Sequence, residues 1–220
     1  MLESGAVGPF FGARTGTAGQ GPEPREGGYV PLAEVYAGDD AWARHVDGVA
    51  RRLGTDERRV AASIAFQGIA ARLWSVALGS AALTQAVPDL APERLYWNPA
   101  VAAPGDLWLR LPAQGRPPGT TGELAVRLRS TVLHGHLLPL EQVVAGLTPL
   151  SGALLRGNSA SALAGSARVL TGWCRSAGRR DAADRAVALV RDLLAGPLLR
   201  GTAASGTWDA HGSGALPFRR

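Results

Sequence analysis

DERRVAASIAFQGIAARLWSVALGSAALTQA, residues 56–86, decides the fold. Thr55 precedes two acids at its start, an arrangement typical of a helix N-terminus, and apolar side chains then recur at roughly helical spacing. Gln67 and Arg72 interrupt the apolar run, and a charge at the middle of a membrane span costs roughly 2.5–3.5 kcal/mol. We therefore predict a buried helix of a soluble domain with no membrane span. Its expected core stripe is Val60, Ile64, Ile69, Leu73, Val76 and Leu83.

Further helices are predicted on both sides of this segment, over residues 40–53, 137–147, 150–175 and 180–194. Gly54 ends the first of them, and Gly196-Pro197 ends the last. Trp42, Val46 and Val49 form the expected apolar stripe of the first helix.

RLYWN (94–98) and DLWLRL (106–111) alternate apolar and polar residues between prolines and glycines, which indicates a β-hairpin. A short strand is also expected over residues 124–128, and a short extended segment over 29–36. Together these elements predict a predominantly helical α+β fold, with a helical core and a small β-hairpin or sheet.

The composition divides the chain into three parts. Residues 1–28 are rich in Gly, Pro and Thr and contain few large apolar groups, so we expect a flexible N-terminal arm. Residues 29–200 are predicted to form the domain. Residues 201–220 are a Gly/Ser-rich tail with Trp208 and Phe218 near its ends.

The charge and cysteine content exclude several classes of protein. All 23 basic residues are arginines spread along the 220-residue chain among acids, which is typical of codon bias and predicts no nucleic-acid partner. The one cysteine, Cys174, excludes a disulfide framework and a self-contained four-cysteine metal or iron–sulfur site. The N-terminus has no basic start followed by a long apolar run, so we expect a cytoplasmic protein.

The common catalytic and metal-binding motifs are not found in the sequence. His134 and His136 lack a neighbouring carboxylate or thiolate, so we predict no metal site there. Ser159 and Ser161 lie outside any G-x-S-x-G elbow, and no phosphate-binding G-x-x-x-x-G-K-[ST] loop is present. No catalytic residue is therefore assigned.

Two otherwise apolar helices carry polar residues on one face. Gln67, Ala71 and Trp74 share a face of the first, with Arg72 beside it. Two interpretations remain open, namely satisfied polar groups between packed helices or a wall that contacts an anionic ligand. In the second, arginines supply charge and Trp74 a stacking plane. The polar face of the other helix consists of Asn158, Ser161, Gly165 and Arg168.

The order of several phrases resembles the FhuF-like ferric siderophore reductases. AFQGIAARLWSVALGSAAL (65–83) and LLRGNSASALAGSARVL (154–170) are specific as an ordered pair. The likeness extends from about Ala61 to Arg220. The remaining phrases are LYWNP (95–99), DLWL (106–109), HGHLLPLEQVVAGL (134–147) and SGALPFRR (213–220).

This resemblance implies a bacterial cytoplasmic protein of iron acquisition that acts on ferric siderophores. In the family, a [2Fe–2S] cluster passes one electron, received from an electron donor, to the chelated Fe(III), and the weaker-bound Fe(II) is released. The residues that we select as contacts of the chelate are Gln67, Arg72, Trp74, Asn158 and Arg168.

The chain departs from the family where its four cluster cysteines are expected, shortly after Arg220. As given, it holds no ligand set for the cluster. We expect a truncated sequence, with a natural cluster-free variant as the other interpretation. The function predicted is a ferric-siderophore reductase-like protein, inactive alone. The alternative is a non-enzymatic siderophore-binding or helical interaction module.

Overall fold

The computed structural model describes residues 3–16, 26–38, 40–110 and 117–202. Seven α-helices and four short strands make up most of this part of the chain, together with three 3₁₀ turns and one π-helical segment. The fold is predominantly helical α+β, as predicted. In chain order the elements are η1 (Glu3–Val7), η2 (Pro9–Phe11), β1 (Arg14–Gly16), η3 (Glu26–Gly28), β2 (Val30–Pro31), α1 (Leu32–Tyr36), α2 (Ala41–Leu53), α3 (Arg58–Thr84), β3 (Leu95–Trp97), β4 (Leu107–Arg110), α4 (Thr121–Leu128), the π-helix η4 (Arg129–Leu137), α5 (Leu138–Leu147), α6 (Gly152–Ser176) and α7 (Arg180–Ala195).

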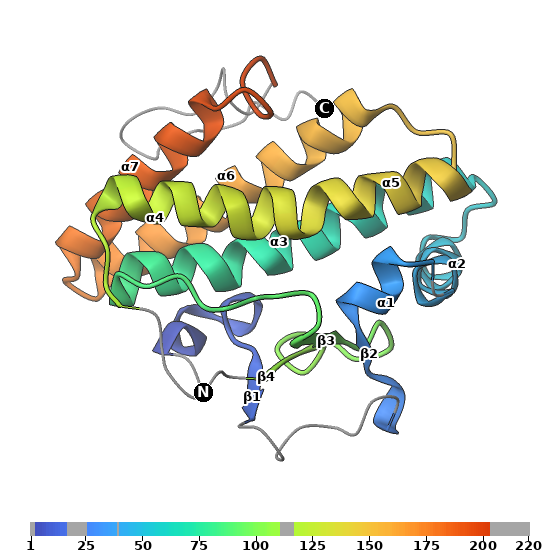
Figure 1. Cartoon of the computed structure of the whole chain (residues 1–220), viewed down its shortest axis with the longest axis horizontal. Coiled ribbons are helices and arrows are strands. Elements are labelled where there is room, and N and C mark those ends of the chain that lie inside the picture. The colour runs from blue at the N-terminus through green and yellow to red at the C-terminus, as the bar shows by residue number, and fades with distance from the viewer. Residues whose placement is uncertain (1–2, 17–25, 39, 111–116, 203–220) are drawn as a thin grey trace.

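Helix α3 is the central element. It packs against α2, α6 and α7, while α4, η4 and α5 form a long rod across its other side (Figure 1). Helix α3 is the one helix among the described residues that is long and apolar enough to suit a membrane span. Because 67% of its 18-residue apolar window is buried inside the protein, it is a core helix by packing.

The early part of the α3 stripe was predicted wrongly. Val60 is 42% exposed and Ile64 43% exposed, whereas Ala61, Ala65 and Phe66 are buried. So many alanines surround the large side chains that helical spacing alone does not distinguish one apolar face from another. The later stripe residues are buried as expected: Ile69, Leu73, Val76 and Leu83.

The sheet lies below the helices in Figure 1 and has the strand order β1-β4-β3-β2. The predicted hairpin is confirmed, since β3 and β4 pair antiparallel with Tyr96 opposite Trp108. Strand β2 extends the sheet antiparallel to β3, and β1 pairs parallel to β4. Only residues 30–31 of the expected extended segment 29–36 are strand, because α1 begins at Leu32.

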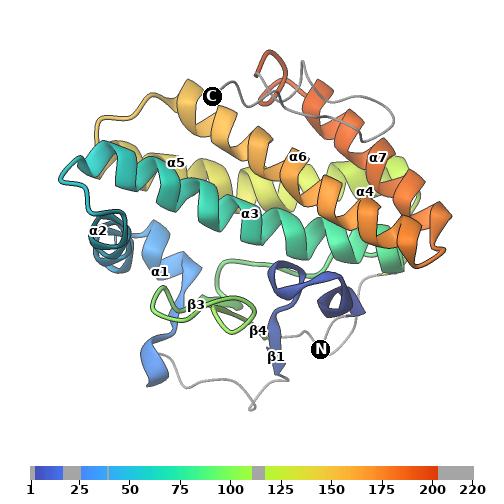
Figure 2. The same ribbon diagram turned by 180° about the vertical axis from the view of Figure 1, so that it is seen from behind.

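The described part of the predicted N-terminal arm is packed into the fold. The turns η1 and η2 lie against α3 (Figure 2), and β1 joins the sheet. Phe11 is 2% exposed and Ala13 is also buried, so two apolar side chains anchor this Gly-rich stretch in the core. Residues 17–25 of the arm and 203–220 of the predicted tail lie outside the described residues.

The predicted strand 124–128 is instead helix α4. Thr120 accepts a hydrogen bond from the backbone N–H of Glu123, and the Glu123 side chain accepts one from the Thr120 backbone N–H. This capping box starts a helix that continues through η4 into α5.

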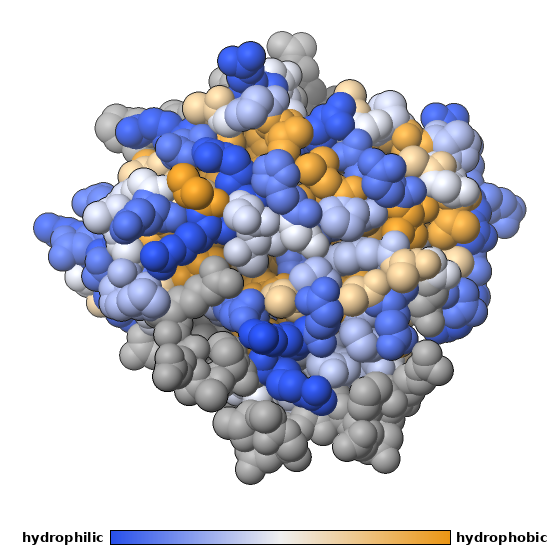
Figure 3. Space-filling view, in the orientation of Figure 1, coloured by the Kyte–Doolittle hydropathy of each residue, from blue (hydrophilic) through white to orange (hydrophobic). Residues whose placement is uncertain are grey.

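On the face shown in Figure 3, hydrophobic residues are separated by hydrophilic ones.

Candidate functional site

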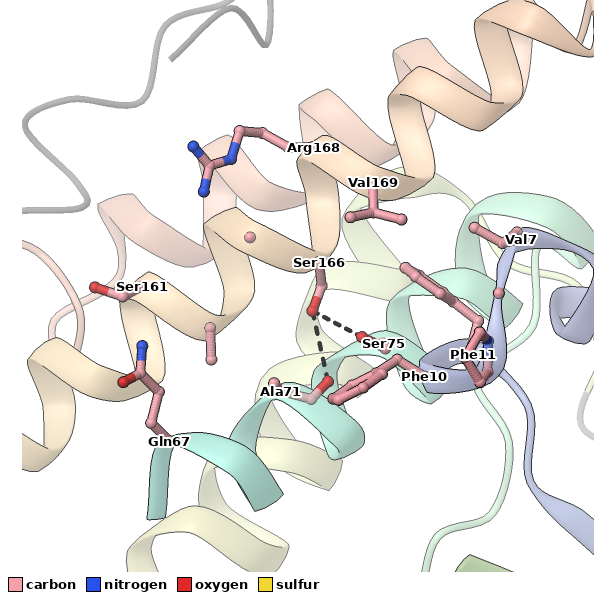
Figure 4. A pocket seen from close by; sticks show the side chains of 14 residues that line it. Val7, Phe10, Phe11, Gln67, Ala71, Ser75, Ser161, Ser166, Arg168 and Val169 are labelled. Atoms are coloured by element: carbon pink, nitrogen blue, oxygen red, sulfur yellow. Dashed lines mark hydrogen bonds between the residues drawn. The ribbon is translucent and has the colours of Figure 1, made fainter. Parts of the chain in front are cut away.

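A cavity of about 690 Å³ opens between α3, α6 and the N-terminal turns η1 and η2. Figure 4 shows its side chains converging from these three segments. The cavity is lined by Val7, Gly8, Pro9, Phe10, Phe11, Gln67, Ala71, Ser75, Ser161, Ala162, Gly165, Ser166, Arg168 and Val169, and we refer to it as the α3–α6 pocket.

Two serines join the helices at the base of this pocket. The hydroxyls of Ser75 and Ser166 lie 2.8 Å apart, and the Ser166 hydroxyl also donates to the Ala71 carbonyl at 3.5 Å (Figure 4). Both serines are buried. Their hydrogen-bonding capacity is therefore largely used between the helices, which keeps this wall closed.

The remaining polar side chains of the pocket lie at one end of it. Gln67 on α3 and Ser161 on α6 lie near each other in Figure 4, and Arg168 stands further along α6. Gln67 and Arg168 are exposed. This end presents an amide, a hydroxyl and a guanidinium, which suit an oxygen-rich or anionic group.

The opposite end of the pocket is apolar. Phe10 is 47% exposed and Val169 is 54% exposed, and both line the pocket together with Val7. An exposed aromatic ring on a concave surface favours a ligand with an apolar or aromatic part. The pocket thus matches a molecule that is polar at one end and apolar at the other.

Arg72 is not available to a ligand. It is 4% exposed and forms an ion pair with Asp106, with its Nη2 2.8 Å and its Nε 2.9–3.0 Å from the carboxylate oxygens. Its Nη2 also donates to the Gly12 carbonyl at 2.8 Å, and its Nη1 donates to the carbonyls of Pro9 and Phe10. The expected direct role of Arg72 in supplying charge to a ligand is therefore not met. The guanidinium is used inside the protein.

Trp74 and Asn158 serve the packing of α3 on α6. The Trp74 indole is fully buried and donates to the Ser159 hydroxyl at 3.2 Å, so its ring offers no stacking plane to the pocket. The Asn158 amide donates to the hydroxyl of Ser63 at 2.8 Å and to its carbonyl at 3.2 Å. Of the five selected residues, Gln67 and Arg168 line the pocket, and Trp74 and Asn158 follow the packing interpretation. Arg72 is satisfied by Asp106 and the N-terminal turn.

The N-terminal contribution to the pocket was missed. Phe10 and Phe11 are adjacent aromatics in a stretch otherwise rich in small residues, and this contrast was the available signal. Ser75 and Ser166 were also overlooked. Their pairing depends on the way α3 crosses α6, which the sequence pattern does not specify.

His136 is a second notable polar group, and it does not line the pocket. It is fully buried in η4, where its Nε2 donates to the Leu90 carbonyl at 2.6 Å and its Nδ1 accepts from the Tyr36 hydroxyl at 2.8 Å. Burial lowers the pKa of His136 to about 4 and raises the pKa of Tyr36 well above its usual value. The neighbouring His134 is exposed, so the two imidazoles have separate environments.

The chain's residues do not fit a four-thiolate iron–sulfur cluster. Its one thiol, Cys174, is buried within α6, and burial raises its pKa. Within the described ranges, no group of three or more His, Cys, Asp or Glu side chains is arranged to hold a metal ion. No electron-transfer step is therefore assigned to the residues of this chain.

Comparisons with protein-family models, with curated proteins and with solved structures found no match to this chain.

Proposed function

We propose that this chain binds a ferric siderophore in the α3–α6 pocket and presents the chelated Fe(III) for reduction to Fe(II) in the cytoplasm. The observation that carries the proposal is that the two phrases of the family resemblance form adjoining walls of one cavity. Residues 65–83 supply Gln67, Ala71 and Ser75, and residues 154–170 supply the α6 wall. The volume of about 690 Å³ lies within the usual range of about 300–1,000 Å³ for small-molecule sites.

The chemistry of the pocket supports a chelate as the ligand. Ferric siderophores combine an oxygen-coordinated metal centre with organic arms, so they need both polar and apolar contacts. The Gln67, Ser161 and Arg168 end suits the oxygen-rich centre, and the Phe10 and Val169 end suits the arms. The protein's formal charge of +5 adds attraction for anionic chelates.

The proposed contribution of this chain is to bind and orient the chelate. The electron comes from a separate redox centre, which by the resemblance is an iron–sulfur cluster. A siderophore holds Fe(II) less tightly than Fe(III), so reduction releases the metal.

Blocking the pocket from inside tests this proposal. A Cβ added at Gly165 meets nothing within 4 Å, and Gly165 lines the pocket, so Gly165→Phe projects a ring into the cavity. Titration calorimetry with a ferric trihydroxamate, a ferric tricatecholate and ferric citrate should find at least one chelate that binds the wild type. We expect Gly165→Phe to weaken that binding at least about tenfold, since a filled site loses more than about 1.4 kcal/mol.

Gly172→Phe is the matched control. Gly172 lies two turns further along the same helix, is exposed, does not line the pocket, and likewise has nothing within 4 Å of an added Cβ. It should bind the chelate as the wild type does. Failure of all three chelates to bind, or equal affinity of Gly165→Phe and wild type, would contradict the proposal.

A carrier that binds the chelate without promoting reduction uses the same pocket and is the alternative. The two differ in the rate at which Fe(II) forms when reduced ferredoxin and an Fe(II)-trapping dye are added. Reduction predicts a faster rise in dye absorbance with the protein present. The carrier predicts binding with an unchanged rate, and a helical interaction module predicts no chelate binding.

A further inference from the structure

Arg72 reaches from the middle of α3 to the turn that forms one wall of the pocket. Its guanidinium has five N–H groups, and each faces an acceptor: Asp106 takes two of them, and the carbonyls of Pro9, Phe10 and Gly12 take the others. The geometry fixes three of the four backbone carbonyls between residues 9 and 12.

The turn is also constrained by its glycines and by Phe11. Gly8 has φ 150° and ψ 170°, a conformation adopted essentially by glycine alone, and a Cβ on Gly12 would lie 3.2 Å from the Cβ of Pro104. Phe11 points into the core, where it is 2% exposed, while Phe10 is 47% exposed and lines the pocket. The Arg72 guanidinium carbon also lies 5.7 Å from the centre of the Phe10 ring.

We propose that Arg72, held by Asp106, is a positioning residue of the α3–α6 pocket: it fixes the turn 9–12 so that Phe10 forms the apolar wall that a ligand meets. The inference rests on the proposed function only in treating this cavity as a ligand site. The sequence predicted that Arg72 contacts the ligand. In this inference Arg72 acts on the ligand through Phe10 instead.

The energetics of a buried ion pair agree with this role. Replacing such a pair by apolar side chains is often neutral for stability, so the pair by itself explains little of the fold's stability. What an apolar replacement cannot supply is a planar set of donors for three backbone carbonyls. Lysine cannot supply it either, because its single ammonium group has no forked geometry.

Hydrogen exchange measures the positioning directly and needs no ligand. In Arg72→Lys, exchange of the Phe10, Phe11 and Gly12 amides should rise at least about tenfold, while exchange in α6 stays near the wild-type rate. Asp106→Asn, which keeps the shape of the partner and removes its charge, provides the same test if Arg72→Lys fails to fold. Unchanged exchange in the segment 9–12 in the folded variant would overturn the inference whatever the pocket binds.

A double-mutant cycle separates positioning from a general structural role. The probe is anilinonaphthalene sulfonate, an aromatic anion that matches the Phe10 wall and the Arg168 end of the pocket. Phe10→Ala and Arg72→Lys should each weaken its binding about three- to tenfold, the size expected for one aromatic contact. The double variant should be no weaker than Phe10→Ala alone. Val126→Ala, on the exposed face of α4, should leave binding unchanged.

The outcomes are distinct from those of the siderophore titration. If Arg72→Lys weakened probe binding equally in the wild-type and the Phe10→Ala backgrounds, Arg72 would act on the fold as a whole, and the inference would be wrong. It would also be wrong if the wild type did not bind the probe or if Phe10→Ala bound it normally. Non-additive loss of probe binding without binding of any ferric chelate would uphold the inference and contradict the proposed function.

Discussion

Burial keeps the His136 imidazole neutral. Its two ring nitrogens are committed to one donor and one acceptor, the Tyr36 hydroxyl and the Leu90 carbonyl. This arrangement fixes the neutral tautomer and ties α1 and the loop before β3 to η4. A proton added to the buried ring would have to be accommodated without water.

The pH dependence of stability follows from this contact. The pKa of His136 is lowered to about 4 in the folded protein, so the unfolded chain binds the proton more readily. The neutral His136 ring therefore contributes fully to the free energy of unfolding above the unfolded-state pKa of about 6.5. This contribution is lost as the pH falls toward 4. Urea unfolding should show a loss of roughly 3 kcal/mol between these limits from this residue. In His136→Gln, the free energy of unfolding should change less with pH over this range.

His134→Gln is the control for this measurement. It replaces an exposed imidazole two residues away and should leave the slope as it is in the wild type. Some slope should remain in His136→Gln because burial also lowers the pKa of His45 to about 4. An unchanged pH profile in His136→Gln would show that the buried ring does not set acid stability.

At this scale the sequence allowed only part of the site to be predicted. Helical spacing is enough to place polar residues on one face of a helix. It therefore identified Gln67 and Arg168, and both line the pocket. The fate of Arg72 depended on Asp106, which lies 34 positions away, and on carbonyls of the N-terminal turn. Helical spacing carries no information about such distant partners.

The N-termini of the helices differ in their side-chain capping hydrogen bonds. Thr120 completes a full capping box at α4, and Ser151 accepts from the Leu154 N–H at α6. Asp40 occupies the same position at α2, yet its side chain makes no capping bond. Hydrogen bonds from Thr120 lower the pKa of Glu123, as expected when a carboxylate accepts from a cap.

Thr120→Ala should destabilise the protein by about 1 kcal/mol, because the first turn of α4 loses its side-chain acceptor. The free energy of unfolding from denaturant titration measures this loss. Thr120→Ser keeps the hydroxyl and should restore most of it. Asp40→Ala, which removes no capping bond, should cost less, and an equal loss in Thr120→Ala and Asp40→Ala would contradict the assignment.

The predicted elements were right where local chemistry and core packing agree. Gly54 ends α2 in the left-handed conformation, with φ 63°, and the hairpin forms where Pro and Gly bound two aromatic runs. The strand predicted over residues 124–128 was wrong because a short run of apolar and polar residues was given more weight than the Thr120-x-x-Glu123 cap in front of it. Such a run is ambiguous, and the cap resolves it.

The described part of the chain shares a hydrophobic core whose members run from Phe11 to Leu199 in the sequence. Cys174 lies in this core, at the α6 surface that faces inward. Because the chain has no other thiol, a thiol reagent reports on the opening of the core alone.

Labelling of Cys174 by a maleimide should be at least about a thousandfold slower in the native protein than in urea, since it requires the core to open. The rate should rise in parallel with the unfolded fraction. Ser176→Cys in a Cys174→Ser background places a thiol two residues away at an exposed position and should react without delay. Fast labelling of native Cys174 would show that α6 opens independently of the rest.

Two walls of the pocket come from distant parts of the chain, with Val7 to Phe11 on one side and Ser161 to Val169 on the other. During synthesis, the N-terminal turn leaves the ribosome long before its partner helix is made. The site is therefore assembled at a late stage of biogenesis, after a loop of about 150 residues has closed. A ligand that needs both walls therefore binds only after α6 has been made and has packed beside the N-terminal turn.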